Sequence, residues 1–166
     1  MRRSRMIIRN EDPTDVAAIR SVVTAAFSRP DEANLVDRLR QEGDSVISLV
    51  ALEGSELVGH VLFSRMRAPL WALGLAPVSV IPERQRGGIG TRLIRAGLDQ
   101  SRQRGWRGVF VLGDPAYYGR FGFDAGLARG FQSPYRGPHF MALALDAELP
   151  TAAGVAEYAP AFRALG

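Results

Sequence analysis

A glycine-rich turn that joins an apolar strand to a helix limits the folds open to this chain more than any other feature of its sequence. A strand-like stretch over residues 71–81 precedes the turn at 85–91, and apolar positions then recur at helical spacing over residues 89–104. Backbone N–H groups at a helix start have no partner within the helix and lie at the positive end of its dipole. Glycine lets an anion approach those groups, so the sequence predicts a phosphate-binding turn. The alternative is an ordinary tight turn whose glycines only ease the backbone.

Two common phosphate-binding motifs do not fit this turn. A Walker loop would end in Gly-Lys-Ser or Gly-Lys-Thr, and the chain contains no lysine. A dinucleotide fingerprint needs a third glycine, and Leu93 stands in that place. The turn also follows several strands rather than the first one, so we expect neither a P-loop nor a dinucleotide-binding fold.

The order of the expected elements predicts a mixed sheet. We expect strands at 6–9, 45–52, 57–66, 71–81, 109–112 and 140–145, and helices from 14, at 31–41 and at 89–104. A helix between two neighbouring strands makes their connection parallel. The predicted fold is therefore α/β of the α+β kind, with a mostly antiparallel central sheet flanked by helices and one parallel strand pair around the helix at 89–104. We expect a single domain over residues 1–166, with residues 1–5 as a flexible basic leader.

Composition excludes several classes of function. The chain has no cysteine, which excludes thiol nucleophiles, disulfides and cysteine-ligated zinc, and we expect no metal. All 21 basic residues are arginine, spread along the chain among 17 acidic ones, so the net charge of +4 does not predict a nucleic-acid partner. No apolar run has membrane-spanning length and the start lacks a signal-peptide core, so we expect a cytoplasmic protein without membrane association.

The residues of the turn resemble a known cosubstrate site. The pattern Gln85-x-x-Gly88-x-Gly90 resembles the pyrophosphate motif of the GNAT superfamily, the GCN5-related N-acetyltransferases, and the preceding Val-x-Pro-Glu is similar to the strand end of that family. The resemblance implies acetyl-CoA as cosubstrate. It assigns cofactor binding to Val78, Ser79, Val80, Gln85, Arg86, Gly87, Gly88, Ile89, Gly90 and Thr91. Arg84 and Arg86 are expected to add charge-assisted contacts.

A second match lies downstream, in the segment Tyr118-x-x-x-Gly122-Phe123. It resembles the family segment whose tyrosine protonates the departing coenzyme A thiolate, which implies that Tyr118 is the general acid. Tyr117 takes this place if the register differs by one residue. The alternative for Tyr118 is a tyrosine that only packs in an aromatic cluster. The segment Gly-Asp-Pro-Ala-Tyr-Tyr, which ends at Tyr118, is similar to a bacterial subgroup of N-acetyltransferases.

The resemblance also implies how the reaction proceeds. Family members let an amine attack the thioester directly, so a chain without cysteine lacks nothing. A backbone N–H of the strand before the turn, where a bulge separates it from its neighbour, stabilises the oxyanion; by position this is the N–H of Val80. Val78 and Ser79 then line the pantetheine arm. The residues left as candidates for the general base are Glu32, His60, Glu83 and His139.

Acetyl transfer to a primary amine is the predicted function, with a small-molecule acceptor favoured over a protein and a homodimer as a possible assembly. The alternatives are a coenzyme A sensor without turnover and a partner-binding domain. Tyr118 favours the enzyme over the sensor, because a sensor has no use for a proton donor beside the sulfur. The tail after Pro150 is interpreted as a terminal helix, a dimer contact or a partly disordered segment.

Overall fold

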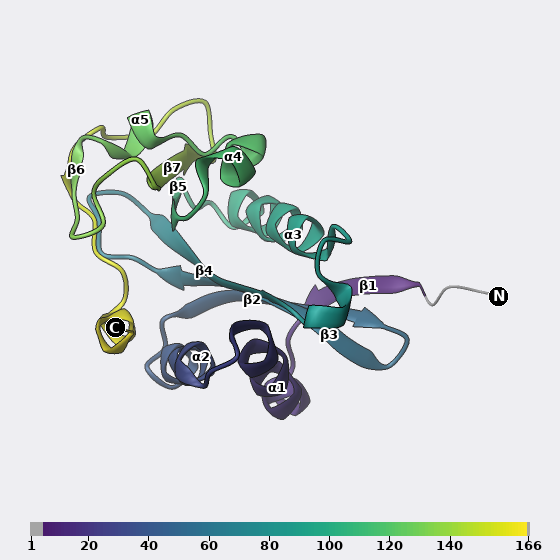
Figure 1. Ribbon diagram of the computed structural model, residues 1–166. Coiled ribbons are helices and arrows are strands. Elements are labelled where there is room, and N and C mark those ends of the chain that lie inside the picture. The colour runs from purple at the N-terminus through teal and green to yellow at the C-terminus, as the bar shows by residue number, and fades with distance from the viewer. Residues whose placement is uncertain (1–4, 166) are drawn as a thin grey trace.

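A six-stranded sheet in the order β1-β2-β3-β4-β5-β7 organises the chain, seen in a computed structural model that describes residues 5–165 (Figure 1). Its strands are β1 (Met6–Asn10), β2 (Ser45–Glu53), β3 (Glu56–Arg65), β4 (Ala72–Val80), β5 (Gly108–Leu112) and β7 (Phe140–Ala144). Neighbouring strands are antiparallel except β4 and β5, which are parallel. The structure thus confirms the predicted mostly antiparallel sheet with one parallel pair.

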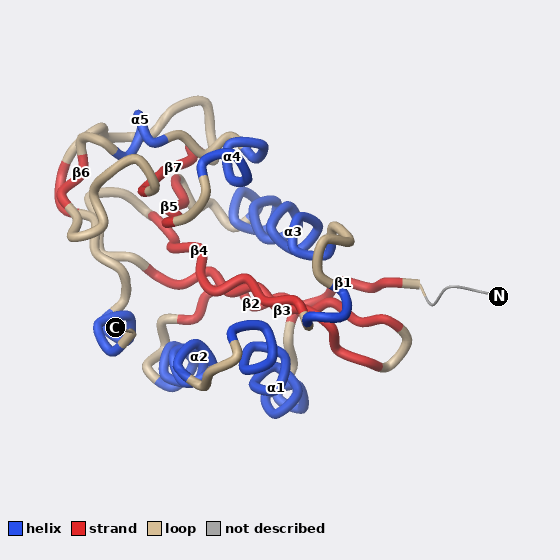
Figure 2. Tube along the Cα trace, viewed as in Figure 1, coloured by secondary structure: helices blue, strands red, loops and turns tan. Residues whose placement is uncertain are grey.

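Helices cover both faces of this sheet. The helices α1 (Val16–Phe27) and α2 (Asp31–Gln41) lie on one face, and α3 (Ile89–Gln103) lies on the other (Figures 1 and 2). The apolar positions of α3 are buried with the inner side chains of β2 to β5, whereas those of α1 and α2 form a second core with Val50 and Leu62. Both cores anchor the strands that approach the glycine-rich turn.

Close approach of α3 to β3 depends on Gly97. A β-carbon added at Gly97 would lie 2.1 Å from Cε1 of Phe63, so the helix backbone sits directly on the buried ring. Any larger residue would force the helix away from the sheet. This contact fixes the height of α3, and with it the position of the turn, above the strands.

The parallel pairing of β4 and β5 is short. Only Ala72 to Gly74 pair with Gly108 to Phe110, and β4 then continues to Val80 without a described strand along that edge. The last stretch of β4 therefore carries backbone groups on an open edge. This gap leads toward the glycine-rich turn.

Several short elements were not predicted from the sequence. They are α4 (Pro115–Tyr118), α5 (Ala125–Ala128), β6 (Phe131–Gln132) and β8 (Gly154–Val155), and β6 and β8 form a separate parallel pair. The tail after Pro150 contains β8 and a 3-10 helix, Pro160–Ala164, instead of a regular terminal α-helix. Its apolar side chains are buried against α1 and α2, because Ala159, Ala161 and Phe162 belong to their core.

The predicted basic leader lies outside the described residues, except for Arg5. Among residues 5–165, no helix combines the length and the apolar character needed to cross a membrane.

Candidate functional site

The glycine-rich turn presents a row of free N–H groups. It starts with a 3-10 helix, Pro82–Arg84, and enters α3 through two residues with positive φ, Arg86 at 68° and Gly88 at 85°. Glycine tolerates this backbone conformation without strain, which explains its presence at the start of α3. Within the described chain, no backbone acceptor pairs with the N–H groups of residues 86–91. These groups are available to an anion.

A cavity of about 360 Å³ lies over this turn. The residues that line it are Val80, Arg84, Gln85, Arg86, Gly88, Ile89, Gly90, Thr91, Tyr117 and Arg120. Most of the residues predicted to bind the cosubstrate therefore meet around one space. Tyr117 and Arg120 were not predicted to be there, although both belong to the aromatic segment that follows β5.

Gln85 has a structural role in this geometry. Its side-chain Nε2 donates a hydrogen bond of 3.0 Å to the carbonyl oxygen of Val80. The bond ties the turn to the end of β4 and occupies a carbonyl that would otherwise be free. Gln85 also lines the cavity over the turn, so its predicted binding role stays a prediction beside this structural one.

The arginines around the turn differ in how free they are. Arg84 is held by Glu53 of β2 at 2.8 Å, which leaves less of its charge for a ligand. Arg86 is exposed and forms no ion pair with any other residue of 5–165. Arg120 lies over the ring of Tyr117, with its guanidinium carbon 4.6 Å from the ring centre. Arg86 and Arg120 are therefore the cations best placed to meet a phosphate.

The open edge of β4 presents a regular set of backbone groups. The hydrogen bond of 3.0 Å from the N–H of Ile81 to the carbonyl of Val58 fixes the pairing of β4 with β3. Because hydrogen-bonded and non-hydrogen-bonded pairs alternate in an antiparallel ladder, the backbone groups of Val78 and Val80 face away from β3. With the Val80 carbonyl taken by Gln85, two N–H groups and one carbonyl remain on this edge.

Ser79 differs from its neighbours. It pairs with His60 across β3 and β4, so its backbone groups face β3 rather than the open edge. Its side chain is buried, and Oγ has no hydrogen-bond partner among the described residues. The prediction that Ser79 lines the pantetheine arm is not matched by this orientation.

The expected bulge in β4 lies earlier than Val80. The register between β3 and β4 shifts between Val61 and Phe63, opposite Ala76 and the cis-linked Pro77. Val80 itself continues the regular ladder with Gly59. The first N–H after the irregularity belongs to Val78, because proline has none.

The two adjacent tyrosines of α4 occupy different surroundings. The Tyr117 hydroxyl lies 3.0 Å from Oγ1 of Thr91, beside the turn. Tyr118 packs edge-on against Phe123, and a β-carbon on Gly113 would lie 2.5 Å from its ring. Burial raises the pKa of Tyr118 to about 12, with a smaller contribution from Tyr117. The Tyr118 hydroxyl therefore keeps its proton across the neutral range and forms no hydrogen bond with any described residue.

Of the candidate bases, three are placed away from this site or are already engaged. Glu32 is buried in α2 and held by the guanidinium of Arg29. Glu83 is exposed in the 3-10 helix. His139 is exposed, with Nδ1 3.1 Å from the carbonyl oxygen of Gly113.

His60 is fully buried and belongs to a polar network. Its Nε2 lies 2.8 Å from Oγ of Ser48, which donates to the carboxylate of Glu11, and Glu11 also accepts two bonds from Arg40 at 2.9 and 3.1 Å. A carboxylate only accepts, so the Ser48 proton points to Glu11 and His60 must donate from Nε2. Nδ1 is then an acceptor, and it has no partner among the described residues. Burial lowers the pKa of His60 to about 4, so the ring is neutral.

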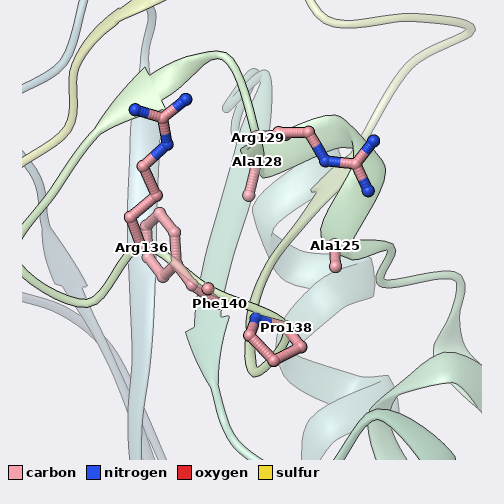
Figure 3. Close-up of a pocket in the computed structure, with 7 residues that line it drawn as sticks. Ala125, Ala128, Arg129, Arg136, Pro138 and Phe140 are labelled. Atoms are coloured by element: carbon pink, nitrogen blue, oxygen red, sulfur yellow. The ribbon is translucent and has the colours of Figure 1, made fainter.

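A second cavity, of about 350 Å³, lies between α5 and the segment that leads into β7 (Figure 3). Ala128 and Phe140 belong to its wall, and Arg129 and Arg136 lie on opposite sides of it. None of the residues predicted for the cosubstrate lines this cavity.

The chain is similar to a family model and to several known proteins. The family model described as Acetyltransferase (GNAT) family matches residues 15–123. The uncharacterized N-acetyltransferase YjhQ of Escherichia coli (strain K12) is 41% identical over 133 residues, which are 75% of this chain and 73% of that protein. The matched range of the family model includes the turn, the open edge of β4 and both tyrosines of α4.

Two solved structures are similar along nearly the whole chain. The GNAT family N-acetyltransferase YhbS from Escherichia coli, in complex with CoA, has a TM-score of 0.91 and 31% identity over 98% of this chain and 94% of that one. A GNAT family acetyltransferase from Brucella melitensis, in complex with acetyl-CoA, has a TM-score of 0.82 and 40% identity over 96% and 99%.

Proposed function

The chain belongs to the acetyltransferase (GNAT) family, and we propose that it transfers the acetyl group of acetyl-CoA to a primary amine by direct attack of the amine on the thioester. The family and its relatives give the reaction class, N-acetylation that depends on acetyl-CoA. The observation that carries the proposal is the unpaired end of β4 beside the free N–H groups of the turn. The turn offers donors for a phosphate, and the edge of β4 offers donors for the arm attached to it.

The pyrophosphate would bind to the N–H groups of residues 86–91. The α3 dipole, the unpaired donors and the absence of a side chain at Gly88 all favour an anion there. Arg86 and Arg120 line the same cavity and would add positive charge. Arg84 would contribute less, because Glu53 already pairs with it.

The pantetheine arm would lie along the open edge of β4. Its amide groups can pair with the backbone of Val78 and Val80 much as an added strand pairs with a sheet edge. The N–H groups of both residues face this edge, so each is a candidate donor for the thioester oxyanion. The Val80 assignment follows from family position, while the irregularity of the strand supports Val78.

Tyr118 would serve the leaving group. Its protonated hydroxyl can donate to the charge that develops on the coenzyme A sulfur. A covalent enzyme intermediate is unnecessary, since the amine attacks the thioester itself. His60 would not take up the proton that the amine releases, because its ring is fully buried and its pKa is about 4.

A small amine is the acceptor that we favour over a protein. A cavity of about 210 Å³ between the segment 133–135 and the tail has walls that include Tyr135, Tyr158 and Phe162. A space of about 210 Å³ can hold a small amine but no segment of a folded partner.

Calorimetric titration with CoA and acetyl-CoA tests the binding half of this proposal. A second assay tests acetyl transfer. The protein is incubated with acetyl-CoA and a panel of small amines and amino acids, and a thiol reagent follows the release of free CoA. Binding with turnover on at least one amine is the expected result. Binding without turnover on any amine favours the sensor, and the absence of binding overturns both readings.

A further inference from the structure

The ring of Tyr158 lies against β4 at the point where its pairing with β5 ends. A β-carbon on Gly74 would lie 2.6 Å from Cε1 of Tyr158, so the ring lies directly on the strand backbone. Gly74 is the last residue of β4 that pairs with β5. The ring therefore stands where the open edge of β4 begins.

The ring approaches from the sheet face opposite to α3. Leu73 and Leu75 belong to the core under α3, so the residue between them, Gly74, faces the other side of the sheet. Tyr158 accordingly packs with the core of α1 and α2. Tyr118 belongs with the α3 core, so the two tyrosines reach the gap from opposite faces.

Aromatic neighbours hold the Tyr158 ring in place. Its ring centre lies 5.0 Å from that of Phe162, 5.5 Å from that of Tyr135 and 6.4 Å from that of Phe140. Burial raises its pKa above the ordinary value, with smaller contributions from Tyr135 and then Tyr118. No described residue accepts or donates a hydrogen bond at the Tyr158 hydroxyl.

The open edge of β4 leads from the glycine-rich turn to the ring of Tyr158. The six steps from Val80 back to Gly74 span about 20 Å, at roughly 3.3 Å per residue. An extended arm that starts at the turn and follows this edge runs toward the ring, so its acyl end is the part that faces Tyr158. Because Gly74 and Phe140 confine the ring, a longer chain could enter only by displacing it.

We propose that Tyr158 sets the acyl-chain specificity of the enzyme, closing the acyl end of the cosubstrate groove so that acetyl fits and longer acyl groups do not. The inference rests on the proposed function, because it takes the arm to lie along β4. Tyr158 is thus a specificity-determining residue that acts through its volume rather than through its hydroxyl.

Binding of free CoA and of acetyl-, propionyl-, butyryl- and hexanoyl-CoA, measured by calorimetry, tests this role without an acceptor amine. Wild type should bind butyryl-CoA about tenfold or more weakly than acetyl-CoA, since a closed apolar site discriminates strongly against extra methylenes. Tyr158→Ala should reduce that ratio to within about threefold, because the removed ring leaves space for the chain. Tyr158→Leu, which keeps more of the core volume, provides a second variant if circular dichroism reports a folding defect.

Two matched variants separate volume from other effects. Tyr158→Phe keeps the ring and should keep the wild-type ratio. Tyr135→Phe keeps the ring that packs on Tyr158 and should also keep that ratio. Equal wild-type affinity for acetyl- and butyryl-CoA, or an unchanged ratio in both Tyr158→Ala and Tyr158→Leu, would overturn the inference. Wild type that fails to bind free CoA would overturn the proposed function instead.

Discussion

The hydroxyl oxygen of Tyr117 lies 3.0 Å from Oγ1 of Thr91, which joins α4 to the first turn of α3. The next residue, Tyr118, packs its ring on Gly113 and Phe123 and leaves its hydroxyl without a described partner. The two consecutive tyrosines thus lie in different surroundings. We propose that Tyr117 supports the phosphate end and that Tyr118 serves the sulfur.

Gly88→Val should greatly weaken coenzyme A binding while the protein stays folded. A β-carbon at Gly88 meets no protein atom within 4 Å, so the new side chain would project into the space that the phosphate needs. The positive φ of 85° adds strain on the order of 1–2 kcal/mol. Calorimetry measures the affinity and circular dichroism the fold.

Gly105→Val is the matched control for this strain. Gly105 has a φ of 83°, also meets nothing within 4 Å, and lies just beyond the opposite end of α3. Its substitution should lower stability by a similar amount and leave the affinity unchanged. Equal loss of affinity in both variants would mean that strain, and not the phosphate site, is responsible.

The Arg86→Gln, Arg120→Gln double variant should bind acetyl-CoA more weakly and with a flatter dependence on salt. Both arginines line the cavity over the turn, and exposed charge contacts are screened by ions. We expect a loss of up to about tenfold at low salt, because exposed ion pairs are individually weak. Arg84→Gln should change the affinity less, since Glu53 already holds that guanidinium. An unaltered salt slope in the double variant would place the phosphates elsewhere.

Stability should fall as the pH drops from about 6.5 toward 4. Burial lowers the pKa of His60 from 6.5 to about 4. As the pH falls, the unfolded chain therefore takes up a proton at this histidine before the native state does, and this uptake stabilises the unfolded state relative to the native state. The contribution is fully present above pH 6.5, and on the order of 3 kcal/mol is lost across this window. The charged groups facing the ring are Glu11 and Arg40, and Arg40 and Ser48 hold the pKa of Glu11 below its ordinary value despite its burial.

Urea unfolding at a series of pH values measures this dependence. His60→Gln should flatten the curve between pH 4 and 6.5, and His139→Gln, at an exposed histidine, should leave it unchanged. The same slope in wild type and His60→Gln would show that other groups cause the loss.

Local sequence signals predicted the elements that build the turn. The glycine spacing and the helical period of α3 lie within one short segment, and Asp114 followed by Pro115 gives the start of α4, where the Asp114 side chain accepts from Ala116 N–H at 3.0 Å. This capping signal could have revealed α4 from the sequence.

Contacts between distant segments were beyond such signals. The pairing of Arg84 with Glu53 depends on the register of β2 beside the turn, and the contact of Tyr158 with Gly74 depends on how the tail returns to the sheet. Neither residue pair has a spacing or periodicity that marks it. The same limit explains why Arg120 was missed: only the fold brings it over Tyr117.

Tyr118→Phe should lower kcat substantially and leave the affinity for acetyl-CoA nearly intact. A group that donates as the thiolate departs acts mainly in the transition state, whereas ground-state binding uses the turn and the edge of β4. With a pKa of about 12, the Tyr118 hydroxyl stays protonated between pH 8 and 10. Deprotonation of Tyr118 therefore cannot explain a fall in rate over that range. A thiol has a reference pKa of about 8.5, which is lower than that of the Tyr118 hydroxyl. The hydroxyl would therefore raise the rate mainly by donating a hydrogen bond to the charge that develops on the sulfur. A general acid contributes a factor of about 10² to 10⁴.

Tyr117→Phe is the built-in comparison for this measurement. It removes the hydroxyl beside Thr91 and should weaken cosubstrate binding slightly, with little change in kcat. The two variants therefore move different kinetic parameters, although the residues are adjacent. Rates measured with the most active amine decide the assignment: a loss in Tyr118→Phe of less than about tenfold, well below the usual contribution of a general acid, would return Tyr118 to the aromatic core. A larger loss in Tyr117→Phe than in Tyr118→Phe would instead transfer the role of proton donor to Tyr117.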